Sequence, residues 1–133
     1  YWSFSVISCS KLSNINSNES LIVKVNLITL GNKAVREVIS HPSSGTYDPI
    51  WSYLAYHLPT ERVKSKYKAI KIYIYKTNNV YVGETKLNWE FIENVTKNNM
   101  YTLRVKNRNE GKVYGFIRVH SRFDVHVDTG VTF

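Results

Sequence analysis

Apolar and polar residues alternate with a period of two along most of the chain, which is typical of strands with one buried face. Trp2, Phe4 and Val6 alternate with serines. Within Ala69–Tyr75, three isoleucines share one face, while a lysine and two tyrosines share the other. Eight segments are predicted as strands: Trp2–Val6, Leu21–Leu30, Ala34–Ser40, Ile50–Leu58, Ala69–Tyr75, Val80–Trp89, Met100–Lys106 and Val113–Phe123.

Residues that interrupt regular structure separate these segments. The cluster His41-Pro42-Ser43-Ser44-Gly45 ends the third segment, and Pro59 ends the fourth. Only Asn88–Thr96 is predicted to hold a helical turn. Short strands at near-regular spacing predict an all-β fold, an eight-stranded antiparallel β-sandwich. We expect a single domain over residues 1–123, with 124–133 as a C-terminal extension or the start of a linker.

Length and composition agree with one globular core. The chain has 133 residues, of which 43% are hydrophobic and 14% aromatic, enough to bury one core without a disulfide or a metal. The apolar runs are far shorter than the roughly 20 residues of a transmembrane helix. Eighteen Lys and Arg against ten Asp and Glu give a net charge of +8, which favours anionic partners.

The ends of the chain and its cysteine content suggest a context. The chain starts at Tyr1 and its one methionine is Met100, so we expect a module of a longer, multidomain protein. Cys9 is the single cysteine, which suits a reducing compartment. We expect a cytoplasmic protein that can associate with the membrane periphery. The sequons Asn18-Glu19-Ser20 and Asn94-Val95-Thr96 would matter only in a secreted protein.

Several pieces of the chain, in order, resemble the C2 domain family over residues 2–123. They are Phe4 to Leu12 with Ile22-Val23-Lys24-Val25, Asp48-Pro49-Ile50-Trp51, Ile70–Tyr75 with Tyr81-Val82-Gly83-Glu84, and Gly111-Lys112-Val113. The resemblance implies a C2-like sandwich. Because the strand before the first top loop opens the chain and the closing strand ends it, it also implies the type II permutation.

The sequence departs from the family where calcium would bind. The resemblance implies an ion held between the first and third top loops by several Asp side chains, since calcium requires clustered oxygen ligands. Here the first loop, Ser10–Ser20, contains no Asp, and the third-loop positions are Lys76, Asn78 and Val80. We therefore expect a calcium-independent member with neither metal nor cofactor.

Basic residues gather in one acid-free stretch. Six bases and no acid lie between Arg62 and Gly83. Lysines 64, 66 and 68 have the parity of the inward Ile70, so they are expected in the loop before that strand. The resemblance implies that Lys24, Lys33 and Tyr75 occupy positions that bind phosphoinositides in some C2 domains. The candidate lipid-binding residues are Lys24, Lys33, Lys64, Lys66, Lys68, Lys71, Tyr73 and Tyr75. Alternatively, the lysines only solvate the sheet and protect its edges.

A second candidate surface lies on the last predicted strand. Tyr114, Phe116 and Arg118 face away from Gly115 and Ile117, and aromatic residues and Arg are common at protein interfaces. These side chains are therefore candidate partner-binding residues. Alternatively, a neighbouring domain or the tail 124–133 covers them.

Other chemistries find little support. Asp124, His126 and Asp128 alternate in the tail, but such a trio near a chain end is usually solvated, and no metal is expected. The histidines and Cys9 form no nucleophile–base pattern, so no enzyme activity is predicted. A basic sheet with tyrosines could stack single-stranded nucleic acid, yet no recognition motif accompanies it. The prediction is a non-catalytic module that docks a parent protein to anionic phospholipid membranes or, alternatively, to a protein partner as a scaffold.

Overall fold

The fold is described from a computed structural model, which covers residues 1–13, 15, 19–44, 48–89 and 98–123. Its elements are β1 (Trp2–Ser10), β2 (Leu21–Thr29), β3 (Ala34–Ile39), β4 (Ile50–Leu58), α1 (Thr60–Lys66), β5 (Tyr67–Lys76), β6 (Tyr81–Asn88), β7 (Asn98–Lys106) and β8 (Val113–Phe123). The tail residues Asp124, His126 and Asp128 lie outside the described residues.

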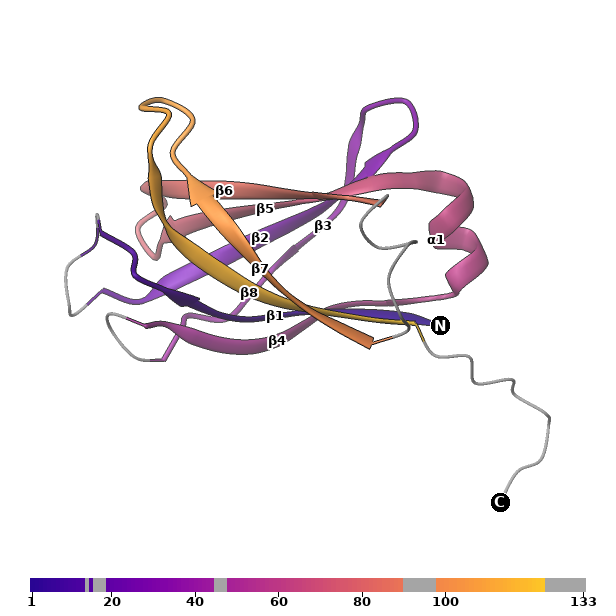
Figure 1. The fold of residues 1–133 in the computed structure, drawn as a ribbon, viewed down its shortest axis with the longest axis horizontal. Coiled ribbons are helices and arrows are strands. Elements are labelled where there is room, and N and C mark those ends of the chain that lie inside the picture. The colour runs from indigo at the N-terminus through magenta and orange to yellow at the C-terminus, as the bar shows by residue number, and fades with distance from the viewer. Residues whose placement is uncertain (14, 16–18, 45–47, 90–97, 124–133) are drawn as a thin grey trace, which may run out of the picture.

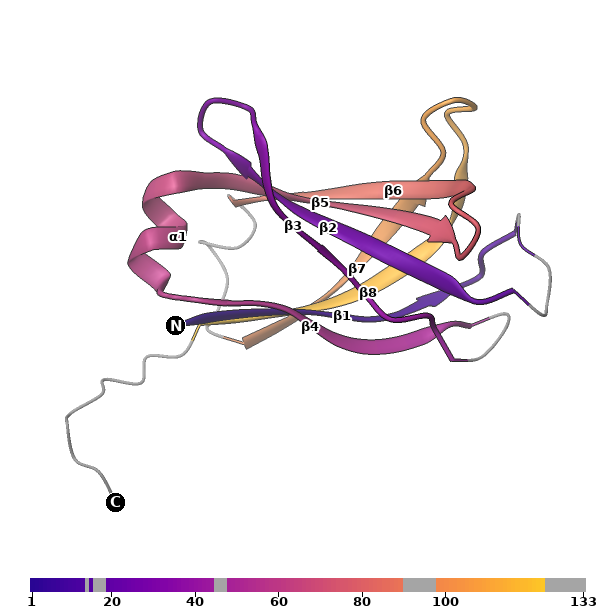
Figure 2. The same cartoon turned by 180° about the vertical axis from the view of Figure 1, so that it is seen from behind.

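The strands form a nearly closed antiparallel sheet with the order β3-β2-β5-β6-β7-β8-β1-β4. One register pair, Glu84 with Lys106, joins β6 to β7. At this junction the sheet folds into two layers, β3-β2-β5-β6 and β7-β8-β1-β4 (Figures 1 and 2). The predicted eight-stranded, C2-like β-sandwich is therefore confirmed. The first and last strands pair with each other along most of their length.

The core lies between the two layers and follows the predicted alternation. Trp2, Phe4 and Val6 of β1 are completely buried, as are the three isoleucines of β5. The indole nitrogen of Trp2 donates a hydrogen bond to Ser121 Oγ at 2.9 Å, so the one polar atom of this large side chain is satisfied inside the core.

The segment before β5 was predicted wrongly as a loop. Lys64 and Lys66 lie on α1, a short helix that buries only Val63 and therefore has no apolar periodicity to reveal it. Lys68 lies within β5. A register shift between Ile28 and Thr29 on the neighbouring strand marks an irregularity that buries two successive residues of β5 and so breaks the parity on which the loop prediction depended.

Other boundaries differ more modestly. β1 continues to Ser10 rather than ending at Val6. Asn88, the first residue of the predicted helical turn, is the last residue of β6, and residues 90–96 of that prediction lie outside the described residues. Within the described ranges, no helix is long and apolar enough to cross a membrane.

The connections between strands collect at two opposite ends of the sandwich (Figure 1). The strand ends that the β1–β2, β3–β4, β5–β6 and β7–β8 links join lie at one end, called the loop end below. The β2–β3 turn and α1 lie at the other. The β2–β3 and β7–β8 hairpins both rise beside the β3-β2-β5-β6 layer, so its outer face lies between them (Figures 1 and 2).

Gly83 permits the close approach of the two layers at their junction. A Cβ atom at this position would lie 2.6 Å from Val105 Cγ1 and 3.2 Å from the carbonyl oxygen of Lys106. Any larger residue would push β7 away from β6. The glycine of the Tyr81–Glu84 segment is thus required by packing.

Candidate functional site

The outer face of β2 and β5 brings together four of the eight candidate lipid-binding residues. Lys24 lies opposite Tyr73 in the strand pairing, and Lys71 follows on the same face. The ammonium group of Lys24 lies 4.6 Å from the centre of the Tyr75 ring, and that of Lys71 lies 5.1 Å from the centre of the Tyr73 ring. We call Lys24, Lys71, Tyr73 and Tyr75, together with Tyr81, the lysine–tyrosine face.

Tyr81 extends the face onto β6. Its ring meets that of Tyr75 edge-on, with the centroids 5.9 Å apart, and the Tyr73 and Tyr75 rings are 6.5 Å apart. Three tyrosine rings therefore form a continuous, half-buried row. The backbone of the two strands beneath keeps this row in place, because consecutive rings occupy neighbouring register positions.

Glu84 lies beside the lysine–tyrosine face and contacts Lys71, Tyr81 and Arg108. Its carboxylate lies 3.2 Å from Lys71 Nζ and 3.7 Å from Arg108 Nη1 on the β7–β8 hairpin. It also accepts a hydrogen bond from the Tyr81 hydroxyl at 2.7 Å. The Arg108 guanidinium in turn lies 4.9 Å from the centre of the Tyr81 ring. One carboxylate thus offsets part of the positive charge of Lys71 and Arg108.

These contacts keep Lys71 and Tyr81 in their usual neutral-pH forms. Hydrogen bonds, first to Tyr73 and then to Glu84, raise the pKa of Lys71 above its ordinary value, so its ammonium stays charged. Desolvation, followed by the hydrogen bond to Glu84, raises the pKa of Tyr81, so its phenol stays protonated. Lys71 therefore presents a cation, and Tyr81 a neutral ring, at physiological pH.

The other four candidate lysines lie elsewhere. Lys33 is exposed at the β2–β3 turn, and Lys68 donates a hydrogen bond to Asn32 of the same turn. Lys64, on α1, lies 5.6 Å from the centre of the Phe123 ring, and Lys66 is exposed on that helix. These lysines lie at the end opposite the loop end (Figure 1) and do not join the row of rings.

An ion pair occupies the loop end where the resemblance implied calcium. Lys76 Nζ lies 3.1 Å from both carboxylate oxygens of Glu19, so the lysine and the one acid beside the first loop neutralise each other. Asn78 Oδ1 accepts a long, 3.4 Å hydrogen bond from the backbone N–H of Val80. Among the residues that the structure describes, no three His, Cys, Asp or Glu side chains lie close enough to hold a metal ion.

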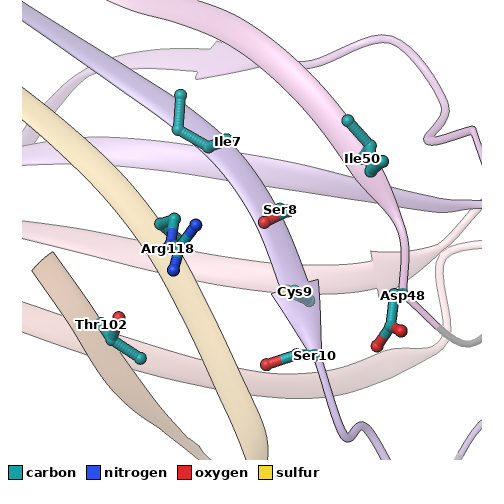
Figure 3. Close-up of a pocket in the computed structure, with 8 residues that line it drawn as sticks. All are labelled: Ile7, Ser8, Cys9, Ser10, Asp48, Ile50, Thr102 and Arg118. Atoms are coloured by element: carbon teal, nitrogen blue, oxygen red, sulfur yellow. The ribbon is translucent and has the colours of Figure 1, made fainter. Parts of the chain in front are cut away.

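The candidate partner-binding residues lie on the opposite layer. Tyr114 and Phe116 are half-buried on the outer face of β8, while Arg118 is exposed. A hollow of about 320 Å³ lies beside Arg118. Figure 3 shows Arg118 on one side of β1, and Asp48 on the other, with small serine side chains between them.

Cys9 borders the same hollow without the features of a nucleophile. The residue is buried, and desolvation by burial raises the pKa of its thiol far above the ordinary range. Because the thiolate is the reactive form, Cys9 is chemically quiet in the folded chain. Its side chain belongs to the core.

Solved structures with the same architecture include C2 domain proteins. One C2 domain-containing protein superposes with a TM-score of 0.64 at 16% identity, over 96% of this chain and 90% of that one. The chain has the fold of a C2 domain. CC2D1B, described as coordinating ESCRT-III activity during the mitotic reformation of the nuclear envelope, matches with a TM-score of 0.69 at 15% identity over 92% of this chain.

PLC21 of S. officinalis matches with a TM-score of 0.65 at 15% identity, over 90% of this chain. The matched region is 54% of the CC2D1B chain and 15% of the PLC21 chain. No family model and no curated protein sequence matches the chain. At these identities the likeness concerns the C2 fold alone.

Sequence reasoning missed Tyr81, a member of the lysine–tyrosine face, and the two charged residues beside it, Glu84 and Arg108. Their roles depend on the pairing of β6 with β5 and on the position of the β7–β8 hairpin, which no local pattern reveals. The available signal was the outward parity of Glu84, which lies next to the buried Gly83.

Proposed function

We propose that this C2 domain is a calcium-independent, non-catalytic module that docks a larger protein to anionic phospholipid membranes through its lysine–tyrosine face. The observation that carries the proposal is the stacking of Lys24 on Tyr75, at 4.6 Å, within a half-buried row of tyrosine rings on the outer face of the sheet. A cation held on an aromatic ring combines the two side-chain types that favour the headgroup region of a bilayer.

The two lysines of the face differ in their neighbours and therefore in their expected contribution to membrane affinity. A basic residue near an anionic bilayer contributes about 1 kcal/mol, decreasing within a Debye length. Lys71 is opposed by Glu84 at 3.2 Å, whereas Lys24 lies on the ring of Tyr75. We therefore expect Lys24 to contribute more than Lys71 to membrane affinity.

The Glu19–Lys76 ion pair supports independence from calcium. Calcium requires six to eight oxygen ligands, and an ammonium group adds a like charge where the ion would lie. Here the carboxylate of Glu19 is already engaged at 3.1 Å. Membrane docking in this proposal uses the side of the sheet and not the loop end.

Protein docking is the second candidate function. The hollow beside Arg118 supports it, and so does the likeness to CC2D1B, whose description concerns coordination of ESCRT-III activity. In this alternative Tyr114, Phe116 and Arg118 contact a partner and the lysines only solvate the sheet. We expect no nucleic acid partner in either case.

Co-sedimentation with vesicles tests the proposal. The purified domain is mixed with phosphatidylcholine vesicles that contain or lack phosphatidylserine and phosphoinositide, at two salt concentrations, in the presence of a calcium chelator. We expect pelleting that requires anionic lipid and weakens with salt. Lys24→Gln/Lys71→Gln should reduce the partition coefficient at least about tenfold, because two charges near the surface are lost.

Arg104→Gln/Arg118→Gln is the matched control. It removes the same charge from exposed residues of the other layer, so it should change vesicle partition less than about twofold, because charges far from the docking face are screened by salt. Equal losses in the two double variants would contradict docking through the lysine–tyrosine face. Absence of pelleting by the unaltered domain would favour the protein-docking alternative.

A further inference from the structure

A groove opens between β6 and β7. The two strands share the register pair Glu84–Lys106 and separate from there toward the end that carries α1 (Figures 1 and 2). Beyond this pair, β6 remains paired with β5 on one side. On the side that faces β7, its edge from Thr85 to Asn88 has no partner strand within the described ranges. Such an edge presents backbone donors and acceptors with which another extended chain can pair.

Two adjoining hollows, of about 410 Å³ and about 320 Å³, lie along this opening. They adjoin because Thr85, Lys86 and Lys106 line both. The larger is also lined by Leu87, which is buried, and by Leu103, which is half-buried. The lining therefore offers apolar surface to a ligand along the unpaired edge.

The walls of the groove are strongly basic. The cationic residues that line the two hollows are Lys71, Lys86, Arg104, Lys106 and Arg108. Glu84 is the one acidic residue in the described linings, and Lys71 and Arg108 already oppose its charge at 3.2 and 3.7 Å. Complementarity of charge therefore requires an anionic partner.

We propose that this groove binds an extended peptide segment of a partner protein in which acidic and apolar residues alternate. Successive side chains of a strand point to opposite sides. The apolar residues of such a segment contact Leu87 and Leu103, the acidic ones reach Lys86 and Arg104, and its backbone pairs with the edge of β6. Since Arg104 lies outside the lysine–tyrosine face, the inference does not depend on membrane docking.

The test uses a short fluorescein-labelled peptide of Glu-Val repeats, with binding followed by fluorescence anisotropy. Lys86→Glu/Arg104→Glu should weaken binding at least tenfold at about 100 mM salt, because two attractive contacts become repulsive. Lys33→Glu/Arg118→Glu carries the same change in charge at exposed positions outside the groove and should weaken binding less than about threefold. N-methylation of alternate peptide amides should also weaken binding, since a methylated amide cannot donate to β6.

Amide chemical shifts of the ¹⁵N-labelled domain locate the peptide. Shifts that concentrate on residues 84–88 and 102–106 support the groove. Shifts on Lys24 and Tyr75 instead, equal losses in the two charge variants, or failure of the repeat peptide to bind would each overturn the proposal. Vesicle partition is the second readout. Arg104→Glu alone should leave it within about twofold of the unaltered domain, and a large loss there without loss of peptide binding would assign the groove to lipid instead.

Discussion

The two outer faces of the sandwich differ in how their side chains are held. On the β2-β5-β6 side, rings and cations contact one another, as in the Lys24–Tyr75 pair, and Glu84 links that side to the β7–β8 hairpin. On the β1 and β8 side, serines stand beside Arg118 and leave a hollow (Figure 3). A face whose side chains are ordered before a ligand arrives loses less conformational entropy on binding, which favours the first face for docking.

The largest expected effect concerns the junction between these faces. Gly83→Ala places a Cβ atom 2.6 Å from Val105 Cγ1, so we expect a loss of about 1–3 kcal/mol in the free energy of unfolding. Urea denaturation measures it. Gly31→Ala is the control, because its Cβ meets only Thr29 Oγ1, at 3.8 Å, and should cost less than about 0.5 kcal/mol. Equal losses in both variants would mean that close packing at Gly83 is unimportant.

The next effect concerns the charge of the lysine–tyrosine face. Glu84→Gln removes the carboxylate that opposes Lys71 and Arg108. We expect partition onto anionic vesicles to rise about fivefold, which corresponds to about 1 kcal/mol per charge near the surface. Glu110→Gln, on an exposed residue of the same hairpin, controls for net charge and should have the smaller effect. Unchanged or weaker partition for Glu84→Gln would separate this face from the membrane.

A smaller effect tests whether the contact between Lys24 and Tyr75 contributes to the free energy of unfolding. A double-mutant cycle with Lys24→Met and Tyr75→Leu should give a coupling free energy of about 0.5–1 kcal/mol in unfolding experiments, as expected for a partly exposed cation on an aromatic ring. The same cycle on Lys33 and Tyr75 should give a coupling near zero, because Lys33 lies at the β2–β3 turn and not in the row of rings. Similar couplings in both cycles would remove the contrast between the two outer faces.

Calcium should have the smallest effect of all. Titration calorimetry at millimolar calcium should show no binding heat, and the midpoint of thermal unfolding should not move. A site whose Kd lay a hundredfold below the calcium concentration would add about 2.7 kcal/mol of stability, which is easily measured. If calcium raised the stability by this amount, and if Glu19→Gln abolished the gain, Glu19 would bind calcium in place of Lys76. That result would contradict independence from calcium.

Part of this organisation could be predicted from the sequence. The isoleucines of β5 alternate with Lys71, Tyr73 and Tyr75, so the inward and outward faces of that strand were readable from its period of two. The same pattern was readable in β1, and the near-regular spacing of such strands predicted the sandwich. These features depend on local burial, which a single strand records in its own residues.

The rest depends on relations between strands. Placing Glu84 beside Lys71 requires the register of β6 on β5, and placing Arg108 beside Tyr81 requires the path of a hairpin. α1 is too short to show an apolar stripe. The irregularity in β5 reverses the parity of Lys68, so strict alternation misplaced it. Long-range pairing and local irregularities are the two features that the period of a sequence does not encode.

The most direct test of the account asks which surface touches the membrane. Amide signals of the ¹⁵N-labelled domain are recorded with anionic nanodiscs in the presence of a chelator. The account predicts line broadening centred on residues 22–26 and 71–75, with little change on residues 114–120. Broadening centred on β8, or on the loop-end residues 77–80, would contradict docking through the lysine–tyrosine face.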